Sequence, residues 1–440
     1  DFTKDPIIAV EENGWLIAKD TTLGADCGIG IAAQLVALTD PDLKCGRIEA
    51  LFTVSEETGL DGAMALEPGF ITGKTLINLD SEDEGELFIG CAGGIDTTAK
   101  FKYTTYPATK EFVKCEFKIF GAQGGHSGDD IDKNRANANK VLARFLYRAL
   151  AKHDIELYEI DGGNKRNAIA REAYAVIGFA KKAEKSILKI FREVVAEVKD
   201  EYKVSDPAVD GIAREVGIHD VKEGTYFGTP KKAIDKNTAA SLIYALYSAP
   251  HGVLAMSNDV KGLVETSTNL ASIKMQKGGI IRIGTSQRSA INSCRRWAAE
   301  MVEACFEMAG ATVTHESEYP GWKPNVNSEI LELSVAAYRK LFGVEPVVRA
   351  IHAGLECGLL SEKLPGLDCV SIGPDMKDIH TPREFYEHPQ FNTWMELIKN
   401  QNEKDIIKYA EEVVANVVKF LPKEIDPRIL FIIIALVAFV

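Results

Sequence analysis

The strongest constraint on the fold is an alternation of strand-like and helix-like segments that is interrupted in mid-chain and then resumes. Residues 28–38 have helical periodicity, whereas residues 48–54 (IEALFTV) and 75–79 (TLINL) have the apolar pattern of buried strands. Strands that alternate with helices build a mainly parallel sheet flanked by helices. The first hundred residues therefore predict part of an α/β domain.

The pattern changes after Gly94, where longer alternating runs begin. These runs and the helical stretches between them have the order β-α-β-β-α-β, with a long insertion before the third strand, which indicates an inserted α+β domain. The strand-like runs are residues 112–120, 172–179 and 279–285, and the helical stretches are residues 134–151 and 289–309.

The α/β pattern returns after Pro324. It consists of a helix at residues 328–341, strands at 345–351 and 368–372, and a terminal helix at about 391–420. The chain is therefore expected to return to the first domain after completing the second.

These segments predict two domains, one of which interrupts the other. The α/β domain would comprise residues 1–96 and 323–423, and the α+β domain residues 97–322. Residues 424–440 form an apolar tail of unknown role. Its last 12 residues, ILFIIIALVAFV, would make a helix about 18 Å long, against roughly 30 Å for a bilayer core, so we expect no membrane span.

The charge and the cysteines exclude further classes of protein. With 64 acidic and 51 basic residues the formal net charge is −13, which argues against a nucleic-acid-binding protein because such proteins neutralise phosphates with Lys and Arg. No two of the eight cysteines form a C-x-x-C motif, and the first residues lack a signal sequence. We therefore expect a cytoplasmic protein.

Carboxylates follow both strands predicted in the first part of the chain. Glu56 and Glu57 come directly after the first strand, and Asp80 ends the second. Ligands of open α/β sheets bind beyond the carboxyl ends of the strands. Successive residues point to opposite sides, so one glutamate can bind a metal ion while its neighbour faces an attacking water. A solvated acidic edge is the alternative in so acidic a chain.

Asp26 and two histidines are the other candidate site residues. Asp26 lies in a glycine-flanked turn that enters a helix, where it would be a helix N-cap or a carboxylate bridging two metal ions. His380 follows a predicted strand and could complete a zinc site. His126, in the GGHSG turn, could contact a substrate, although a structural hydrogen bond is the alternative for either histidine. His352 has no distinguishing local context.

The chain contains no G-x-S-x-G, P-loop or H-E-x-x-H motif, but eight ordered segments resemble the aminoacyl-histidine dipeptidases. These enzymes are the Xaa-His dipeptidase branch of the dizinc peptidases, which also include carnosinases and carboxypeptidase G. The segments extend to about residue 400 and are TTLGADCGIG, TVSEETGLDGA, LINLDSEDEGELFIGCAGG, GGHSG, DGGNKRNAIARE, VETSTNLA, IHAGLECGLL and SIGPDMKDIHTPRE.

The resemblance implies a site with two zinc ions in the α/β domain. Asp26 would bridge the ions, Glu57 and His380 would be the remaining ligands of one ion, and Asp80 would bind the other. Glu56 would be the general base that acts on a zinc-activated water. The implied reaction is metal-dependent hydrolysis of dipeptides, preferentially carnosine-like Xaa-His dipeptides, with Mn²⁺ or Co²⁺ as alternative metals.

The resemblance also implies that the inserted domain is a lid. His126 would polarise the scissile carbonyl and stabilise the oxyanion, while Asn167, Arg288 and Gly354 would hold the substrate. Arg288 is a natural partner for the terminal carboxylate. Closure of the lid would exclude water, and related lids often pair, so we expect a homodimer through this domain.

The sequence departs from the family pattern in its first part. The family has an H-x-D motif upstream of the bridging aspartate, whose histidine is a zinc ligand, but no His precedes His126 here. We therefore expect an N-terminally truncated chain in which one zinc ion is weakly held. Asp20 and Cys27 replace the usual Gly and Asn. Two alternatives are a catalytically impaired homologue and a different amide hydrolase, such as a tripeptidase or an N-acyl amino acid hydrolase.

Overall fold

The computed structural model describes residues 7–19, 21–40, 46–56, 60–216, 230–377 and 385–387. The chain divides into two compact units. The first comprises the described residues of Asp1–Cys91, Trp322–Ala350 and Leu355–Val440, and the second those of Ala92–Gly321 and Ile351–Gly354. The divisions lie within a few residues of the predicted domain limits, except that residues 351–354 join the second unit.

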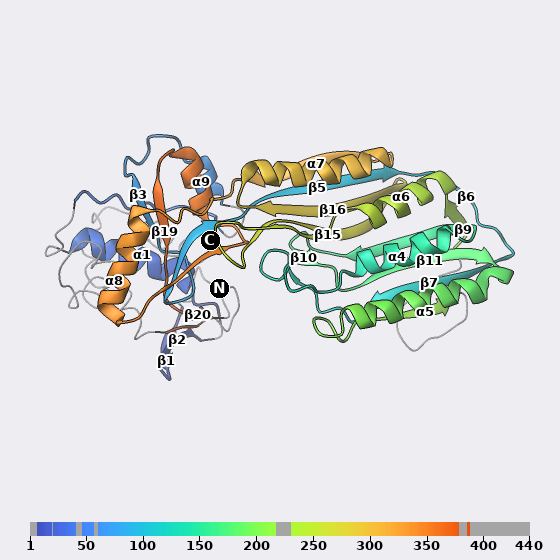
Figure 1. Ribbon diagram of the computed structural model, residues 1–440, viewed down its shortest axis with the longest axis horizontal. Coiled ribbons are helices and arrows are strands. Elements are labelled where there is room, and N and C mark those ends of the chain that lie inside the picture. The colour runs from blue at the N-terminus through green and yellow to red at the C-terminus, as the bar shows by residue number, and fades with distance from the viewer. Residues whose placement is uncertain are drawn as a thin grey trace. The chain divides into compact units, whose positions relative to one another are not determined.

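The first unit contains a mixed four-stranded sheet with the strand order β18-β4-β19-β3 (Figure 1). β19 pairs in parallel with β3 and antiparallel with β4. The strands are Val347–Ile351 (β18), Glu86–Cys91 (β4), Asp368–Ser371 (β19) and Thr75–Asn78 (β3).

Helices lie on both faces of this sheet, which confirms the predicted α/β class. Helices α1 (Ala25–Thr39) and α8 (Glu329–Phe342) share an apolar core with Val370 of β19. The next side chain along the strand points to the opposite face. There Cys369 Sγ lies 3.6 Å from Ser361 Oγ of α9 (Glu356–Lys363).

The caps of α8 explain why this helix could be predicted from the sequence. The Ser328 hydroxyl accepts a hydrogen bond from the Leu331 N–H at 3.1 Å, and Gly343 ends the helix in the left-handed conformation with φ 70°. Both residues are standard cap residues for these positions. The prediction of a helix at residues 328–341 is confirmed.

The strand predicted at residues 48–54 is wrong, because no described strand pairs with this segment. The side chains of Ile48, Phe52 and Val54 are exposed. The segment is instead held at its end by Gly62, whose N–H donates to the Val54 carbonyl at 2.9 Å. An apolar alternating pattern can supply the face of a sheet, but a strand also needs the hydrogen bonds of a neighbour.

The remaining described elements of the first unit are small. A short helix, α3 (Asp61–Ala65), packs against α9 through Ala63 and Leu359. A second sheet has the order β1-β2-β21-β20. Its strands are Ala9–Glu12 (β1), Trp15–Ala18 (β2), Phe385–Glu387 (β21) and Met376–Lys377 (β20). The predicted terminal helix and the apolar tail lie outside the described residues.

The second unit is a nine-stranded sheet with four helices along one face (Figure 1). The strand order is β12-β7-β11-β9-β15-β16-β5-β17, and β14 pairs with β15. The strands are Gly93–Lys102 (β5), Phe112–Phe120 (β7), Ile155–Gly163 (β9), Ala173–Ala180 (β11), Asp210–Glu215 (β12), Gly252–Met256 (β14), Val264–Gln276 (β15), Ile280–Ser289 (β16) and Thr312–Tyr319 (β17). The helices are Ala138–Leu150 (α4), Glu184–Glu201 (α5), Lys236–Ser248 (α6) and Asn292–Met308 (α7).

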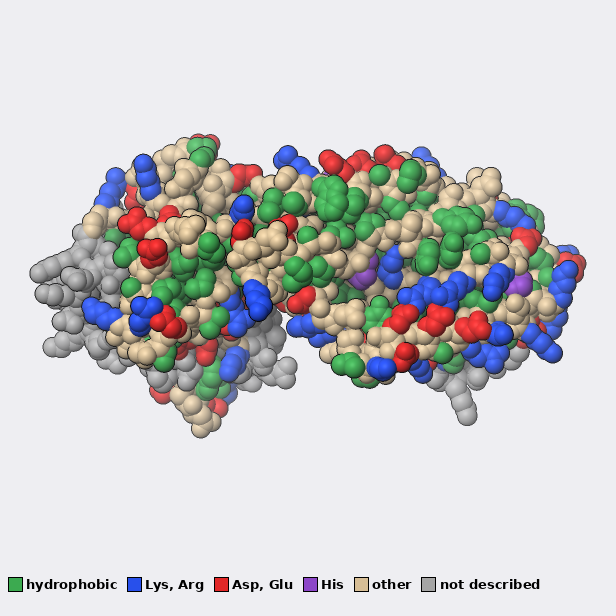
Figure 2. Space-filling model, in the orientation of Figure 1, with side chains coloured by type: hydrophobic (Ala, Val, Ile, Leu, Met, Phe, Trp, Pro, Cys, Tyr) green, Lys and Arg blue, Asp and Glu red, His purple; other side chains and the backbone are tan. Residues whose placement is uncertain are grey.

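The predicted strand-like runs are present as β7, β11 and β16, and the predicted helical stretches as α4 and α7. The second unit also contains β9, between α4 and β11, and the helix α5, which were not predicted. Its core is built around Phe117 of β7, Phe145 of α4 and Phe191 of α5, whose ring centroids lie 4.5 to 5.0 Å apart. On the outer surface, Arg144 and Arg148 of α4 pair with glutamates of α5, visible as adjacent blue and red rows in Figure 2. Exposed pairs of this kind add little stability, so the aromatic core holds the layers together.

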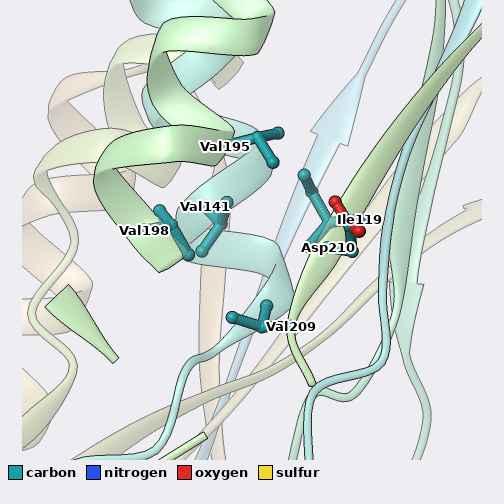
Figure 3. Close-up of a pocket in the computed structure, with 6 residues that line it drawn as sticks. All are labelled: Ile119, Val141, Val195, Val198, Val209 and Asp210. Atoms are coloured by element: carbon teal, nitrogen blue, oxygen red, sulfur yellow. The ribbon is translucent and has the colours of Figure 1, made fainter. Parts of the chain in front are cut away.

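A small hollow lies between α5 and the sheet of the second unit (Figure 3). It does not admit a water molecule. Its lining is Ile119, Val141, Val195, Val198, Val209 and Asp210. We therefore regard it as a packing gap and not as a ligand site.

Within the described part of the chain, no helix is both long enough and apolar enough to cross a bilayer.

Candidate functional site

Two of the predicted carboxylates approach each other in the first unit, and the charge of a third acts on one of them. Asp26 lies in the first turn of α1, Glu56 follows the segment that was predicted to be a strand, and Asp80 lies just beyond β3. Asp80 is within hydrogen-bonding reach of Asp26, and the charge of Glu56 also acts on it. The structure thus brings together residues that are widely separated in the sequence.

Asp26 is not the N-cap of α1, so that alternative is wrong. The N-cap is Gly24, which has the left-handed conformation with φ 74° and no side-chain cap. Asp26 itself has the non-helical backbone angles φ −86° and ψ 108°, and the Asp26–Cys27 peptide bond is cis. The Asp26 carboxylate lies within hydrogen-bonding reach of Asp80.

The electrostatics of this group favour a bound cation. Removal from water raises the pKa of Asp80 well above its ordinary value, and the nearby Asp26 and Glu56 carboxylates raise it further. A hydrogen bond with the Cys27 thiol acts in the opposite direction. Carboxylates held this close repel one another, and a divalent cation between them would remove that repulsion.

Cys27 supports this arrangement as a neutral thiol. Burial and the charges of Asp80 and Asp26 raise its pKa well above the ordinary value. Its Sγ donates to the carbonyl of Leu79 at 2.9 Å, which ties the start of α1 to the end of β3. Gly30 makes this possible, because a Cβ there would overlap Cys27 Sγ.

The predicted ligands Glu57 and His380 lie outside the described residues. Among the residues that the structure describes, no three His, Cys, Asp or Glu side chains are grouped as metal ligands. Asp26 and Asp80 are the two predicted ligands whose positions are known. Their carboxylates are donors that suit zinc and also manganese, so the described residues fit part of a dinuclear site.

The other predicted site residues lie in the second unit, on the face of the sheet opposite the helices or in loops near it. Ser267 of β15 is the cross-strand partner of Arg288 of β16, so their side chains lie on one face. Asn269 is two residues beyond Ser267 and shares this face. We call these three residues, with His126 and His352, the polar face.

His126 is held in an anchored turn. Its N–H donates to Asp130 Oδ2 at 2.8 Å, and the Ser127 N–H donates to the carbonyl of Asn167 at 2.8 Å. The imidazole is one-third exposed, with Nδ1 3.1 Å from Asp129 Oδ2. That hydrogen bond with His126 lowers the pKa of Asp129, and the resulting carboxylate orients the ring.

Asn167 and its loop are positioned by Asn269, a residue that the sequence analysis missed. The Asn269 side-chain amide donates to the carbonyls of Arg166 and Ala168 at 3.3 and 2.9 Å. Arg166 in turn pairs with Asp96 at 2.7 Å. Asn167 itself is exposed, so its side chain is available to a ligand while its backbone is fixed.

Arg288 and Gly354 are the remaining predicted substrate residues. Arg288 is 8% exposed, and its Nε has no hydrogen-bond partner in the described structure. A buried guanidinium group with a bare N–H is suited to bind an anion. Gly354 lies against Tyr319, where a Cβ would come within 3.0 Å of the ring.

Comparison with known proteins agrees with this division into units. Residues 108–206 match the family of the peptidase dimerisation domain, M20_dimer. The cytosol non-specific dipeptidase of Escherichia coli strain K12 is 37% identical over 388 residues, which cover 87% of this chain and 77% of that protein. The crystal structure of aminoacylhistidine dipeptidase from Vibrio alginolyticus is similar with a TM-score of 0.84 and 36% identity, over 91% of this chain and 79% of that one.

Proposed function

The chain belongs to the M20 family of peptidases, whose dipeptidase relatives hydrolyse peptide bonds. We propose that it cleaves Xaa-His dipeptides with the help of two bound zinc ions. The observation that carries the proposal is the close approach of Asp26 and Asp80 in the first unit, together with the charge of Glu56, which also acts on Asp80. Such a group of acids is costly unless it binds cations or moves protons.

The proposed metal ligands are Asp26, Asp80, Glu57 and His380. Bound zinc would act as a Lewis acid on the scissile carbonyl and lower the pKa of water. Asp26 would contribute to both ions and Asp80 to one. Asp80 lies beyond the end of β3 and Asp26 at the start of α1, so the sheet and the helix that packs on it would hold these two proposed ligands.

We propose Glu56 as the general base. Its carboxylate would take a proton from the attacking water and deliver it to the amine of the leaving residue. The charge of Glu56 acts on Asp80, so the proposed base lies near one of the proposed metal ligands.

The polar face of the second unit would bind the dipeptide. His126 would donate a hydrogen bond to the oxyanion that forms at the scissile carbonyl, with Asp129 holding the ring. Arg288 would pair with the terminal carboxylate of the substrate, and Asn167 and Gly354 would contact its backbone. The buried, bare Nε of Arg288 supports this role.

The metal requirement and the substrate class can be tested together. Hydrolysis of β-alanyl-histidine is measured after exhaustive chelation and again after Zn²⁺, Mn²⁺ or Co²⁺ is restored; we expect loss and recovery. An undiminished rate after chelation would contradict the metal site. A panel of Xaa-His, Xaa-Ala, tripeptide and N-acyl substrates then separates a histidine preference from the broad specificity in the Escherichia coli relative's name.

We further propose that the chain is a cytoplasmic homodimer. The Escherichia coli relative is named a cytosolic enzyme, and residues 108–206 match a dimerisation domain. Sedimentation equilibrium of the purified chain tests the second point. A mass of one chain over the micromolar concentration range would contradict it.

A further inference from the structure

We propose that His352 is a positioning residue that holds the substrate-binding elements of the polar face, through a hydrogen bond to Ser267 and a backbone contact with the His126 turn. This inference rests on the proposed function for its kinetic consequence, but its structural part can be tested without any activity. His352 had no distinguishing context in the sequence.

The backbone around His352 belongs to the second unit. The Ala92 N–H donates to the carbonyls of Ile351 and Ala353 at 3.1 and 2.9 Å, which fixes the segment on both sides of His352. The carbonyl of His352 lies against Gly128, where a Cβ would come within 2.5 Å of its oxygen. His352 therefore contacts the same turn that carries His126.

The imidazole of His352 makes the second contact. Its Nε2 lies 2.7 Å from Ser267 Oγ, and Ser267 is the cross-strand partner of Arg288. A shift of Ser267 would therefore be transmitted to Arg288 on the same face of the sheet. In this way one buried residue is linked to the His126 turn through its backbone carbonyl and to Arg288 through its side chain and Ser267.

The protonation state of His352 suits a fixed hydrogen-bonding role. Burial lowers the pKa of His352 to about 3, and the nearby charges of Arg288 and His126 also lower it. The charge of Asp129 acts in the opposite direction and raises this pKa. The ring is therefore neutral near pH 7, and Nε2 keeps one hydrogen-bonding role toward Ser267.

The second ring nitrogen shows that stability alone does not explain this residue. Nδ1 is buried and makes no hydrogen bond of regular geometry in the described structure, although the backbone of Val264 acts on the ring and His352 is only 6% exposed. A bare buried polar atom lowers stability. An apolar side chain would avoid that cost, but it could not hold Ser267.

A matched pair of variants separates the hydrogen bond from the mere presence of a polar residue. In His352→Gln the side-chain amide nitrogen can reach the position of Nε2, whereas in His352→Asn it reaches only that of Nδ1. We expect His352→Asn and Ser267→Ala to raise KM for β-alanyl-histidine about tenfold with kcat changed less than about threefold, and His352→Gln to stay near wild type.

Hydrogen exchange of the full chain gives a readout that does not need activity. We expect His352→Asn and Ser267→Ala to speed exchange in the peptides of residues 124–130 and 286–290, with residues 176–180 of β11 as the unchanged reference. Unchanged exchange in both test peptides would overturn the proposal. So would a loss of kcat with unchanged KM, or His352→Gln behaving like His352→Asn. If the wild-type chain has no hydrolase activity, only the proposed function is refuted. The hydrogen-exchange comparison would still test whether His352 positions the polar face.

Discussion

Replacing Gly128 with alanine tests how tightly the His126 turn is fitted to its surroundings. A Cβ at this position would lie 2.5 Å from the carbonyl oxygen of His352 and 3.1 Å from Nδ1 of His126, whereas ordinary contacts begin at 3.4 Å. One of the two segments must therefore move by about 0.9 Å. Overpacking of this kind costs about 1–3 kcal/mol, and a catalytic group misplaced by about 1 Å can cost up to about 100-fold in rate.

We therefore expect Gly128→Ala to lower kcat/KM for β-alanyl-histidine by about 10- to 100-fold and to lower Tm. The assays are steady-state hydrolysis and thermal unfolding followed by circular dichroism. Gly46→Ala is the matched control, because a Cβ at residue 46 would meet nothing within 4 Å. If the two variants have the same kcat/KM and the same Tm, the inferred packing of Gly128 against His126 and His352 is refuted.

Two further predictions concern the same unit. The pKa of His352 is lowered from 6.5 to about 3, so the unfolded chain binds a proton that the folded chain does not, and stability is lost as pH falls below 6.5. When the pH is lowered from 7.5 to 5.5, the free energy of unfolding should fall by about 1.4 kcal/mol less in His352→Gln than in the wild type. Urea titration at the two pH values measures this difference, and equal losses in the two proteins would contradict a neutral buried His352. Asp206 accepts hydrogen bonds from the Gln123 and Ala136 N–H groups on either side of the His126 turn. Asp206→Ala should therefore cost about 2–4 kcal/mol while Asp206→Asn costs less, and calorimetry showing equal costs would argue against this clamp.

Much of the fold could be predicted because local patterns and packing agree. The strand at residues 112–120 alternates apolar and polar side chains, and the structure contains it as β7. The helix that begins after Ser328 has both of its cap residues in the sequence. The segment at residues 48–54 shows the limit of this reasoning, because its pattern is strand-like but no described strand pairs with it.

The candidate site could be predicted only in part, because the missing contacts are long-range. Asp26, Glu56 and Asp80 follow short motifs, and the structure brings them together. Asn269 holds a loop 101 residues away in the chain, and Ser267 contacts His352 at a separation of 85 residues. Strand register sets these pairs, and no local spacing reveals it. The proposed ligands Glu57 and His380 stay predictions.

The most direct test of the central claim is the rate of β-alanyl-histidine hydrolysis by zinc-loaded wild type, Glu56→Gln and Glu67→Gln. Glu67 is an exposed glutamate of the same unit and serves as the matched control. If Glu56 is the general base, Glu56→Gln should lower kcat by about 100-fold or more, while Glu67→Gln keeps the wild-type rate. Equal kcat values for Glu56→Gln and wild type would contradict the proposed mechanism.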